Sequence, residues 1–99
     1  MLRMKVSPQQ IENFARDGVV CVRDAFAPEW IELLTRGIHH NIARPSPRGR
    51  LWDRDDKGRT CFYDSQVWRD IAEYREFVER SPMAAIAGQL LQARTSGML

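Results

Sequence analysis

The sequence predicts a small α+β domain that is mainly helical, with about four helices and two short strands. Apolar residues recur at helical spacing in four stretches: 11–15, 31–42, 74–78 and 83–91. Serine–proline pairs, which favour helix starts, precede the first and last of these stretches. Two short runs of β-branched or aromatic residues, 19–22 and 60–63, have the length and composition of strands.

The first helix is predicted to begin after Ser7. This serine can cap the helix, Pro8 suits the first helical position, and Gln10 sits where a capping-box partner belongs. The helix should end at Gly18, because a left-handed residue is needed there. The run 19–22 then follows as the first predicted strand.

The second helix is predicted to run from Pro28 to a point before Pro45, since the residue preceding a proline is pushed away from helical geometry. Ala27 is a poor cap for it. Four apolar residues share one face and predict that this face packs into a core: Ile31, Leu34, Ile38 and Ile42.

Residues 43–59 are predicted to form a loop, because prolines and glycines interrupt any regular element. The stretch holds six basic residues against three acidic ones. It is therefore either a solvated loop or a basic lid over an anionic substrate such as an acyl-CoA or a phosphate. Leu51 and Trp52 are expected to act as an apolar anchor that holds the loop against the body of the protein.

Two further helices are predicted in the last third of the chain. Residues 70–73 resemble a capping-box start for a helix that ends near Arg80, and Ser81–Pro82 opens the last helix. The inward-facing residues of the two helices are expected to be Tyr74, Phe77, Val78, Met83, Ile86, Ala87, Leu90 and Leu91.

The composition is that of an ordinary globular protein of 99 residues with a net charge of +2. This charge is too small to indicate nucleic-acid binding. No signal peptide or membrane span is recognisable, so a cytoplasmic protein without a membrane partner is expected. Cys21 lies in an apolar run and Cys61 beside Phe62, so both are predicted to be buried free thiols. A zinc site would require a CxxC pair or nearby histidines, and neither is present.

The only histidines, His39 and His40, are adjacent on the predicted second helix. Neighbouring helical side chains point about 100° apart, so the two cannot comfortably bind one ion. Neither is followed by the x-Asp or x-Glu of a facial triad. No catalytic, cofactor-binding or metal-binding residue is therefore assigned.

Three stretches resemble the N-terminal portion of the phytanoyl-CoA dioxygenase family, whose members are non-haem Fe(II)/2-oxoglutarate-dependent oxygenases. They are FARDGVVCVRDAFAPEWIELL (14–34), CFYDSQVWRDIAEYREFVERSP (61–82) and MAAIAGQLLQA (83–93). The order and spacing of all three carry the resemblance. It implies that residues 1–99 form the helical N-terminal part of a double-stranded β-helix, or jelly-roll, oxygenase whose barrel is missing.

In that family the iron is held by a His-x-Asp pair and a distal histidine, and 2-oxoglutarate by a basic residue. All of these lie in the barrel, after the region matched here. The resemblance therefore implies that Fe(II) and 2-oxoglutarate serve the full-length family and that neither binds this chain alone. It also implies that Tyr63, Asp64 and Trp68 line a substrate cleft near the barrel mouth. The alternative is that Tyr63 and Trp68 belong to the core and Asp64 to a turn or cap.

Two functional hypotheses follow. The first is the N-terminal part of an oxygenase that hydroxylates a small or acyl-type substrate in the full-length family, and that is inactive as this chain. The second is a non-catalytic helical module that binds a partner through its apolar surface. The first hypothesis also predicts that the isolated chain either self-associates or remains partly molten, because apolar helix faces and a strand edge are left without partners.

Overall fold

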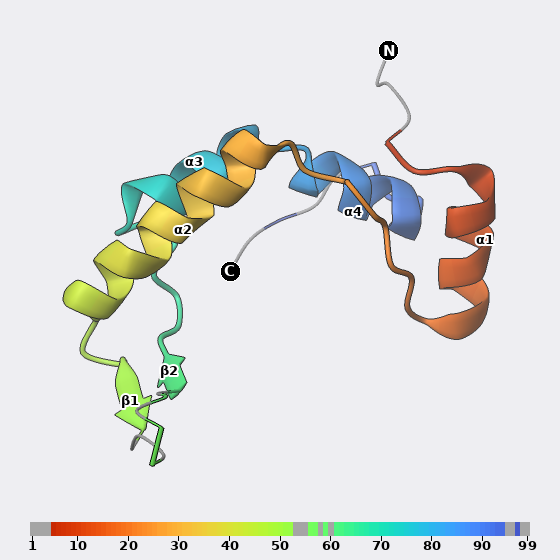
Figure 1. The fold of residues 1–99 in the computed structure, drawn as a ribbon. Helices are drawn as coiled ribbons and strands as arrows, with labels where there is room; N and C mark the ends of the chain where they lie inside the picture. The colour runs from red at the N-terminus through yellow and green to blue at the C-terminus, as the bar shows by residue number, and fades with distance from the viewer. Residues whose placement is uncertain (1–4, 53–55, 58, 60, 95–96, 98–99) are drawn as a thin grey trace.

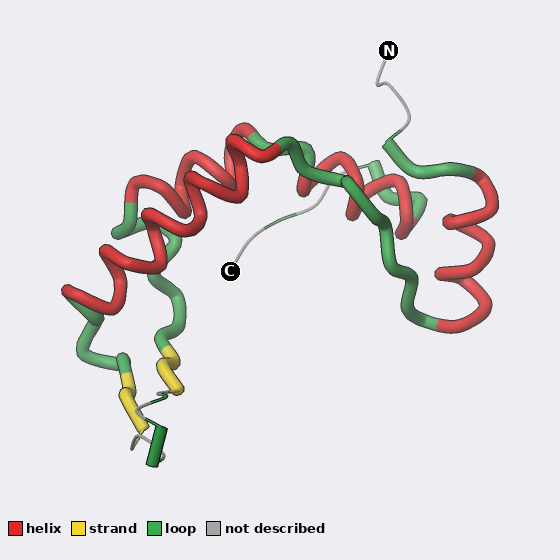
Figure 2. Tube along the Cα trace, viewed as in Figure 1, coloured by secondary structure: helices red, strands yellow, loops and turns green. Residues whose placement is uncertain are grey.

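The computed structural model describes residues 5–52, 56–57, 59, 61–94 and 97. Over these residues the chain is mainly helical, as predicted, with four helices and two short antiparallel strands. Their order is α1 (Pro8–Asp17), α2 (Pro28–Ala43), β1 (Arg50–Trp52), β2 (Cys61–Tyr63), α3 (Ala72–Arg80) and α4 (Met83–Leu91) (Figures 1 and 2). The helices form two pairs, α2 with α3 and α1 with α4, and the β-hairpin extends from the end of the first pair (Figure 1).

The boundaries of α1 are those that its sequence predicts. The Ser7 hydroxyl accepts a hydrogen bond from the backbone N–H of Gln10 at 3.1 Å. The Gln10 side chain accepts one in return from the backbone N–H of Ser7 at 2.8 Å, which completes the capping box. Gly18 has a φ of +75°, a conformation that residues with a Cβ rarely adopt. Local chemistry therefore determines both ends of this helix.

Residues 19–22, predicted as a strand, do not form one within the described part of the chain. The segment is a connection between α1 and α2 in which Val19 is 70% exposed. No backbone hydrogen bond joins it to another described residue. A strand requires a neighbouring strand, and the hairpin strands pair with each other instead. The predicted burial of the two cysteines is wrong, since Cys21 and Cys61 are both exposed.

The prediction for the inward face of α2 is largely wrong. The buried residues of this helix are Leu33, Gly37 and Asn41, and they face α3. Leu34 is half-buried, whereas three members of the predicted core stripe are about half exposed: Ile31 (53%), Ile38 (47%) and Ile42 (46%). Helix α3 thus covers a face that lies beside the isoleucine stripe.

The predicted loop 43–59 is irregular only in part, because it contains β1. This strand pairs with β2 so that Arg50 lies opposite Tyr63 and Trp52 opposite Cys61. Thr60, the first residue of the predicted strand 60–63, lies outside the described residues. The prediction that residues 51–52 anchor the loop to the body of the protein is wrong, because both are exposed. The Trp52 ring instead packs against the Tyr63 ring, with the two ring centroids 6.2 Å apart.

Helix α3 begins without the predicted capping box. Its N-cap is Ile71, which offers no side-chain hydrogen bond. The Ser81 hydroxyl, by contrast, accepts a hydrogen bond from the backbone N–H of Met83 at 3.1 Å at the start of α4. Most of the predicted inward residues of the two helices are at least half-buried, but Leu91 is 60% exposed.

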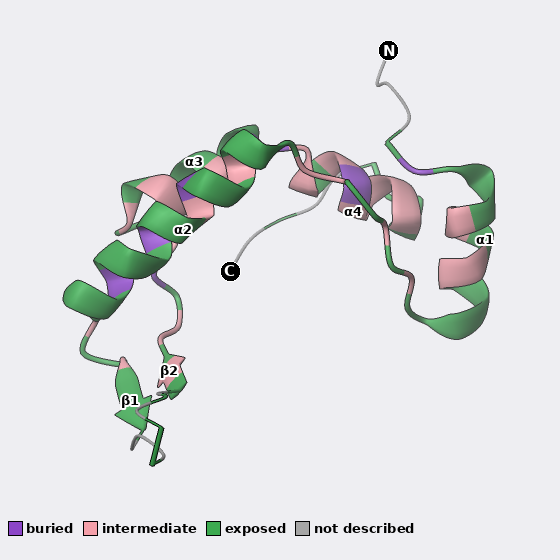
Figure 3. Ribbon diagram, in the orientation of Figure 1, coloured by how far each residue is buried: buried purple, intermediate pink, exposed green. Residues whose placement is uncertain are grey.

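The buried core is thin and divided between the two helix pairs (Figure 3). Its buried apolar residues among those described are Val6, Leu33, Val67 and Ile86. The accessible surface is 8101 Å², whereas a compact monomer of this mass exposes about 5,800 Å². None of the described helices combines the length and apolarity needed to cross a membrane.

Candidate functional site

A polar groove of about 900 Å³ lies between α2 and α3 and the segments that follow and precede them. Its volume is within the range of small-molecule sites. One wall, on α2, carries basic groups at four-residue intervals: Arg36, His40 and Arg44. The opposite wall, at the start of α3, carries acidic groups: Asp70, Glu73 and Glu76. The groove is thus lined by a row of basic side chains that faces a row of acidic ones.

One pair closes across this groove. Nδ1 of His40 lies 2.6 Å from Oε2 of Glu73, and the Glu73 side chain is only 14% exposed. A hydrogen bond from its own backbone lowers the pKa of Glu73, desolvation partly opposes this, and the contact with His40 and the charge of Arg36 lower it further. The pair joins α2 to α3, and sequence reasoning missed it because the two residues lie far apart in the chain.

Asn41 forms the floor of the groove and is only 5% exposed. Its Nδ2 donates to the hydroxyl of Tyr74 at 3.4 Å. Its Oδ1 is buried and has no hydrogen-bond partner among the described residues. An unpaired buried acceptor is unfavourable, so this amide is a point at which an added donor would stabilise the protein.

Asp64 joins the two ends of the hairpin. Its Oδ2 accepts from the backbone N–H of Ser46 at 2.8 Å, and its Oδ1 accepts from the Ser46 hydroxyl at 2.5 Å and from the backbone N–H of Ser65 at 2.9 Å. Desolvation would raise the pKa of Asp64, but these hydrogen bonds and the charge of Arg48 outweigh it and lower the pKa. These hydrogen bonds give Asp64 a structural role, in which it holds together the two chain segments at the base of the hairpin.

The structure does not bring Tyr63, Asp64 and Trp68 together into one cleft wall. Tyr63 is 52% exposed on the hairpin, and Asp64 faces Ser46 at the hairpin base. Trp68 lines a separate apolar groove of about 320 Å³ between α2, α3 and the start of α4. The guanidinium carbon of Arg69 lies 5.0 Å from the centroid of the Trp68 ring. Of the three residues, Trp68 is the one that lines this apolar groove.

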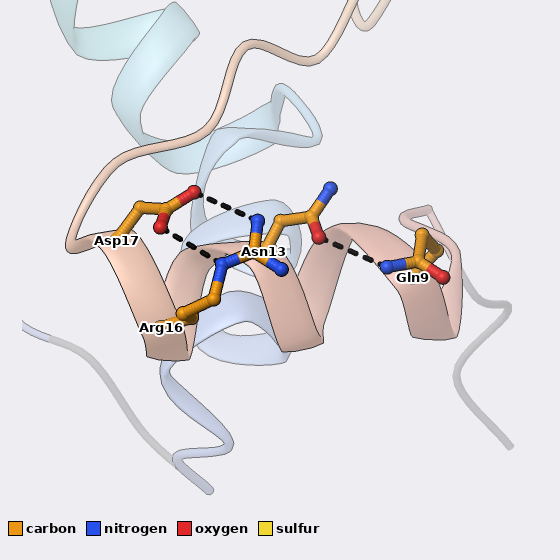
Figure 4. Close-up of polar contacts among 4 residues, drawn as sticks. All are labelled: Gln9, Asn13, Arg16 and Asp17. Atoms are coloured by element: carbon orange, nitrogen blue, oxygen red, sulfur yellow. Dashed lines mark hydrogen bonds and ion pairs between the residues drawn. The ribbon is translucent and has the colours of Figure 1, made fainter.

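The outer face of α1 carries a second polar cluster (Figure 4). Nε2 of Gln9 donates a hydrogen bond to Oδ1 of Asn13 at 2.9 Å. Arg16 donates twice to Asp17, at 2.9 and 3.0 Å, and this contact lowers the pKa of Asp17 although desolvation partly opposes it. These side chains satisfy one another on a solvent-facing surface, so the cluster is structural.

The described residues do not fit an iron site. They contain no group of three or more His, Cys, Asp or Glu side chains close enough to hold a metal ion. His40 is already engaged by Glu73, and His39 is its neighbour on an exposed face of α2. A facial triad requires two histidines and a carboxylate around one ion. No catalytic step through iron is therefore derived for these residues.

Comparison with known proteins adds no relative. No family model matches the chain, and no curated protein or solved structure shows significant similarity to it.

Proposed function

We propose that this chain is the N-terminal helical part of a phytanoyl-CoA dioxygenase-like oxygenase, and that residues 19–22 add a strand to a sheet formed by the barrel. The observation that carries the proposal is the segment 19–22 itself. It has the β-branched composition of a strand and forms no backbone hydrogen bond with any described residue. Backbone groups without partners at the edge of a structure are suited to strand pairing.

The activity proposed for the full-length protein is hydroxylation of a small or acyl-type substrate with Fe(II) and 2-oxoglutarate. This rests on the sequence resemblance, because the donor set described above does not hold iron. The 99-residue chain is therefore expected to bind no Fe(II) stoichiometrically and to turn over no 2-oxoglutarate. Iron binding with 2-oxoglutarate turnover by this chain would contradict that expectation.

Reading the coding DNA beyond the last codon, in all frames, tests the oxygenase proposal directly. A continuation that encodes a His-x-Asp pair and a distal histidine is expected. In the longer protein, the backbone amides of residues 19–22 should exchange hydrogen on the order of 100-fold more slowly than in the 99-residue chain, because strand pairing protects them. Absence of the His-x-Asp sequence, or equal exchange in the two proteins, would overturn the proposal.

A second candidate function is a non-catalytic module that binds a partner through α2. The exposed stripe formed by Ile31, Ile38 and Ile42 favours this candidate. It requires neither iron nor strand pairing at residues 19–22. The two candidates therefore make separate predictions, one for hydrogen exchange and the other for association through α2.

A further inference from the structure

The exposed stripe on α2 has the spacing of a helix–helix seam. Its four members, separated by four, three and four residues, are Ile31, Thr35, Ile38 and Ile42. This is the alternating three- and four-residue repeat of a short coiled coil, counted as positions d, a, d and a. The stripe extends roughly 17 Å along the helix, and α3 covers the adjacent face and not the stripe.

The one polar member of the stripe does not oppose apolar packing. The hydroxyl of Thr35 donates to the backbone carbonyl of Ile31 at 2.8 Å. Its hydrogen-bonding need is therefore met within α2, and burial of the side chain leaves no donor unpaired. The seam can thus be buried without the penalty of an unsatisfied hydroxyl.

Polar side chains beside the seam indicate which occupant fits it. Glu32 and His39 lie seven residues apart, so they share one flank of the stripe. A second copy of α2 packed antiparallel would place Glu32 beside the second copy's His39, and the reverse, on the same flank. A parallel copy would place this flank beside the opposite flank of the second copy, where Leu34 and Asn41 lie. Only the antiparallel orientation therefore lets the Glu32 carboxylate accept a hydrogen bond from the His39 imidazole across the seam.

The surface area also accommodates a second copy. The chain exposes 8101 Å², which exceeds the area expected of a compact monomer by roughly 2,300 Å². Each partner contributes about 800 Å² to a standard interface. Leu34, next to the stripe on its other flank, continues the apolar surface into the groove lined by Trp68, Val78 and Met83. The apolar surface available to a second copy thus extends beyond the stripe itself.

We propose that this chain forms a homodimer through an antiparallel pairing of α2, with Ile31 packed against Ile42 of the second copy and Thr35 against Ile38. The seam is short, so the dimer is weak, with a dissociation constant on the order of 10–100 μM. The inference identifies the partner in the second candidate function and does not depend on residues 19–22.

Sedimentation velocity on the 99-residue chain between about 1 and 300 μM tests the dimer. The wild-type chain should shift from monomer to dimer mass. Ile38→Glu should raise the dissociation constant at least about tenfold, because it places an unpaired charge in the seam. Leu91→Glu, which makes the same kind of change at an exposed position on α4, should leave it unchanged. Circular dichroism establishes that each variant is folded.

A monomeric wild type at every concentration would overturn the proposal. So would unchanged association of Ile38→Glu or equal loss of association in Leu91→Glu. Should Ile38→Glu fail to fold, Ile38→Gln provides the same test with a smaller perturbation, and the same outcomes apply. None of these results depends on the DNA reading or on hydrogen exchange at residues 19–22, so failure of the dimer is distinguishable from failure of the oxygenase proposal.

Cysteine cross-linking tests the orientation. The free, exposed Cys21 and Cys61 are first changed to serine. The double variant Thr35→Cys/Ile38→Cys should form an intermolecular disulfide, because the thiol at position 35 of one copy then faces the thiol at position 38 of the other. Either single variant alone should not. Efficient cross-linking of the single variants would indicate a parallel dimer and overturn the antiparallel pairing.

Discussion

Gly37 is the residue that sets the distance between α2 and α3. A Cβ at this position would lie 2.8 Å from Cε1 and 2.9 Å from Cδ1 of Tyr74. We expect Gly37→Ala to lower the free energy of unfolding by about 1–3 kcal/mol, because the tyrosine ring must move and the helices must separate. Urea denaturation measures the change.

Gly88→Ala is the control for Gly37→Ala. This glycine is also helical, but a Cβ there would meet only the Ala93 carbonyl oxygen, at an ordinary 3.4 Å. Removing glycine from a helix should raise the free energy of unfolding by about 0.5–1 kcal/mol. If both variants change stability in the same direction, the steric explanation for Gly37 is wrong.

Asp64 makes the hairpin base sensitive to acid. Because its pKa is lowered in the folded protein, its contribution to stability is present above the ordinary carboxyl pKa of about 3.9. That contribution is lost as the pH falls through the lowered value. The protection of the Ser46 amide from hydrogen exchange, followed by NMR, should therefore decrease only below about pH 3.9.

In Asp64→Asn the Ser46 amide should be less protected and its protection independent of pH over the same range, because the titrating group is gone. A wild-type midpoint at or above the ordinary carboxyl pKa would contradict the lowered pKa of Asp64.

Helix capping differs between α1 and α2, and this difference is testable. The N-cap of α2 is Ala27, which has extended backbone angles (φ −62°, ψ 153°) but no side-chain hydrogen bond. Ala27→Ser should raise the free energy of unfolding by about 1 kcal/mol, and Ser7→Ala should lower it by a similar amount. Thermal and urea unfolding together measure both changes.

Ala15→Ser is the matched control for the capping prediction. It makes the same chemical change inside α1, beyond its first turn and at an exposed position. Serine has a lower helix propensity than alanine, so this variant should be slightly destabilising. Stabilisation by Ala15→Ser equal to that of Ala27→Ser would show that the effect is not capping.

The helices also show how far periodicity alone can predict packing. It predicted the existence of all four helices, whereas the pattern of Ser7, Pro8 and Gln10 predicted the capping chemistry of α1. It did not predict which face of α2 is buried, because apolar or small residues extend around the helix from Leu33 to the isoleucine stripe. The face that is covered depends on Gly37, which lets α3 approach closely. Such a contact is not visible in a hydrophobic pattern.

The whole molecule is extended, because its two helix pairs share little buried surface. The Cα radius of gyration is 16.3 Å and the principal extents are 44 × 29 × 25 Å. A compact domain of this length has a radius of gyration of about 13 Å. Small-angle X-ray scattering on Ile38→Glu, the variant designed to be monomeric, should yield a radius of gyration of at least 16.3 Å. A radius near 13 Å would mean that the helix pairs close on each other in solution.

The sequence predicted only part of what lines the two grooves. Of the three residues proposed to line a cleft, Trp68 lies in the apolar groove. Asp64 has the turn role that was the stated alternative, and Tyr63 is exposed on the hairpin. The polar groove was missed altogether, although its basic wall has a visible signal in the four-residue spacing of Arg36, His40 and Arg44. Its acidic wall begins more than 20 residues later, and only the antiparallel packing of α2 and α3 brings the walls together.

The sequence by itself determined the features that depend on neighbours along the chain. These are the four helices, the capping box at Ser7, the left-handed turn at Gly18 and the strand character of 61–63. Each arises from dihedral preferences and hydrogen bonds within a few residues.

Tertiary structure alone decided whether residues 19–22 form a strand, which side of α2 is buried and where the two cysteines lie. A strand exists only if another backbone pairs with it, and a face is buried only if another element covers it. In this chain the hairpin pairs with itself and α3 covers the face beside Gly37. The segment 19–22 and the isoleucine stripe are consequently left exposed, because the described part of the chain supplies no further sheet or helix to cover them.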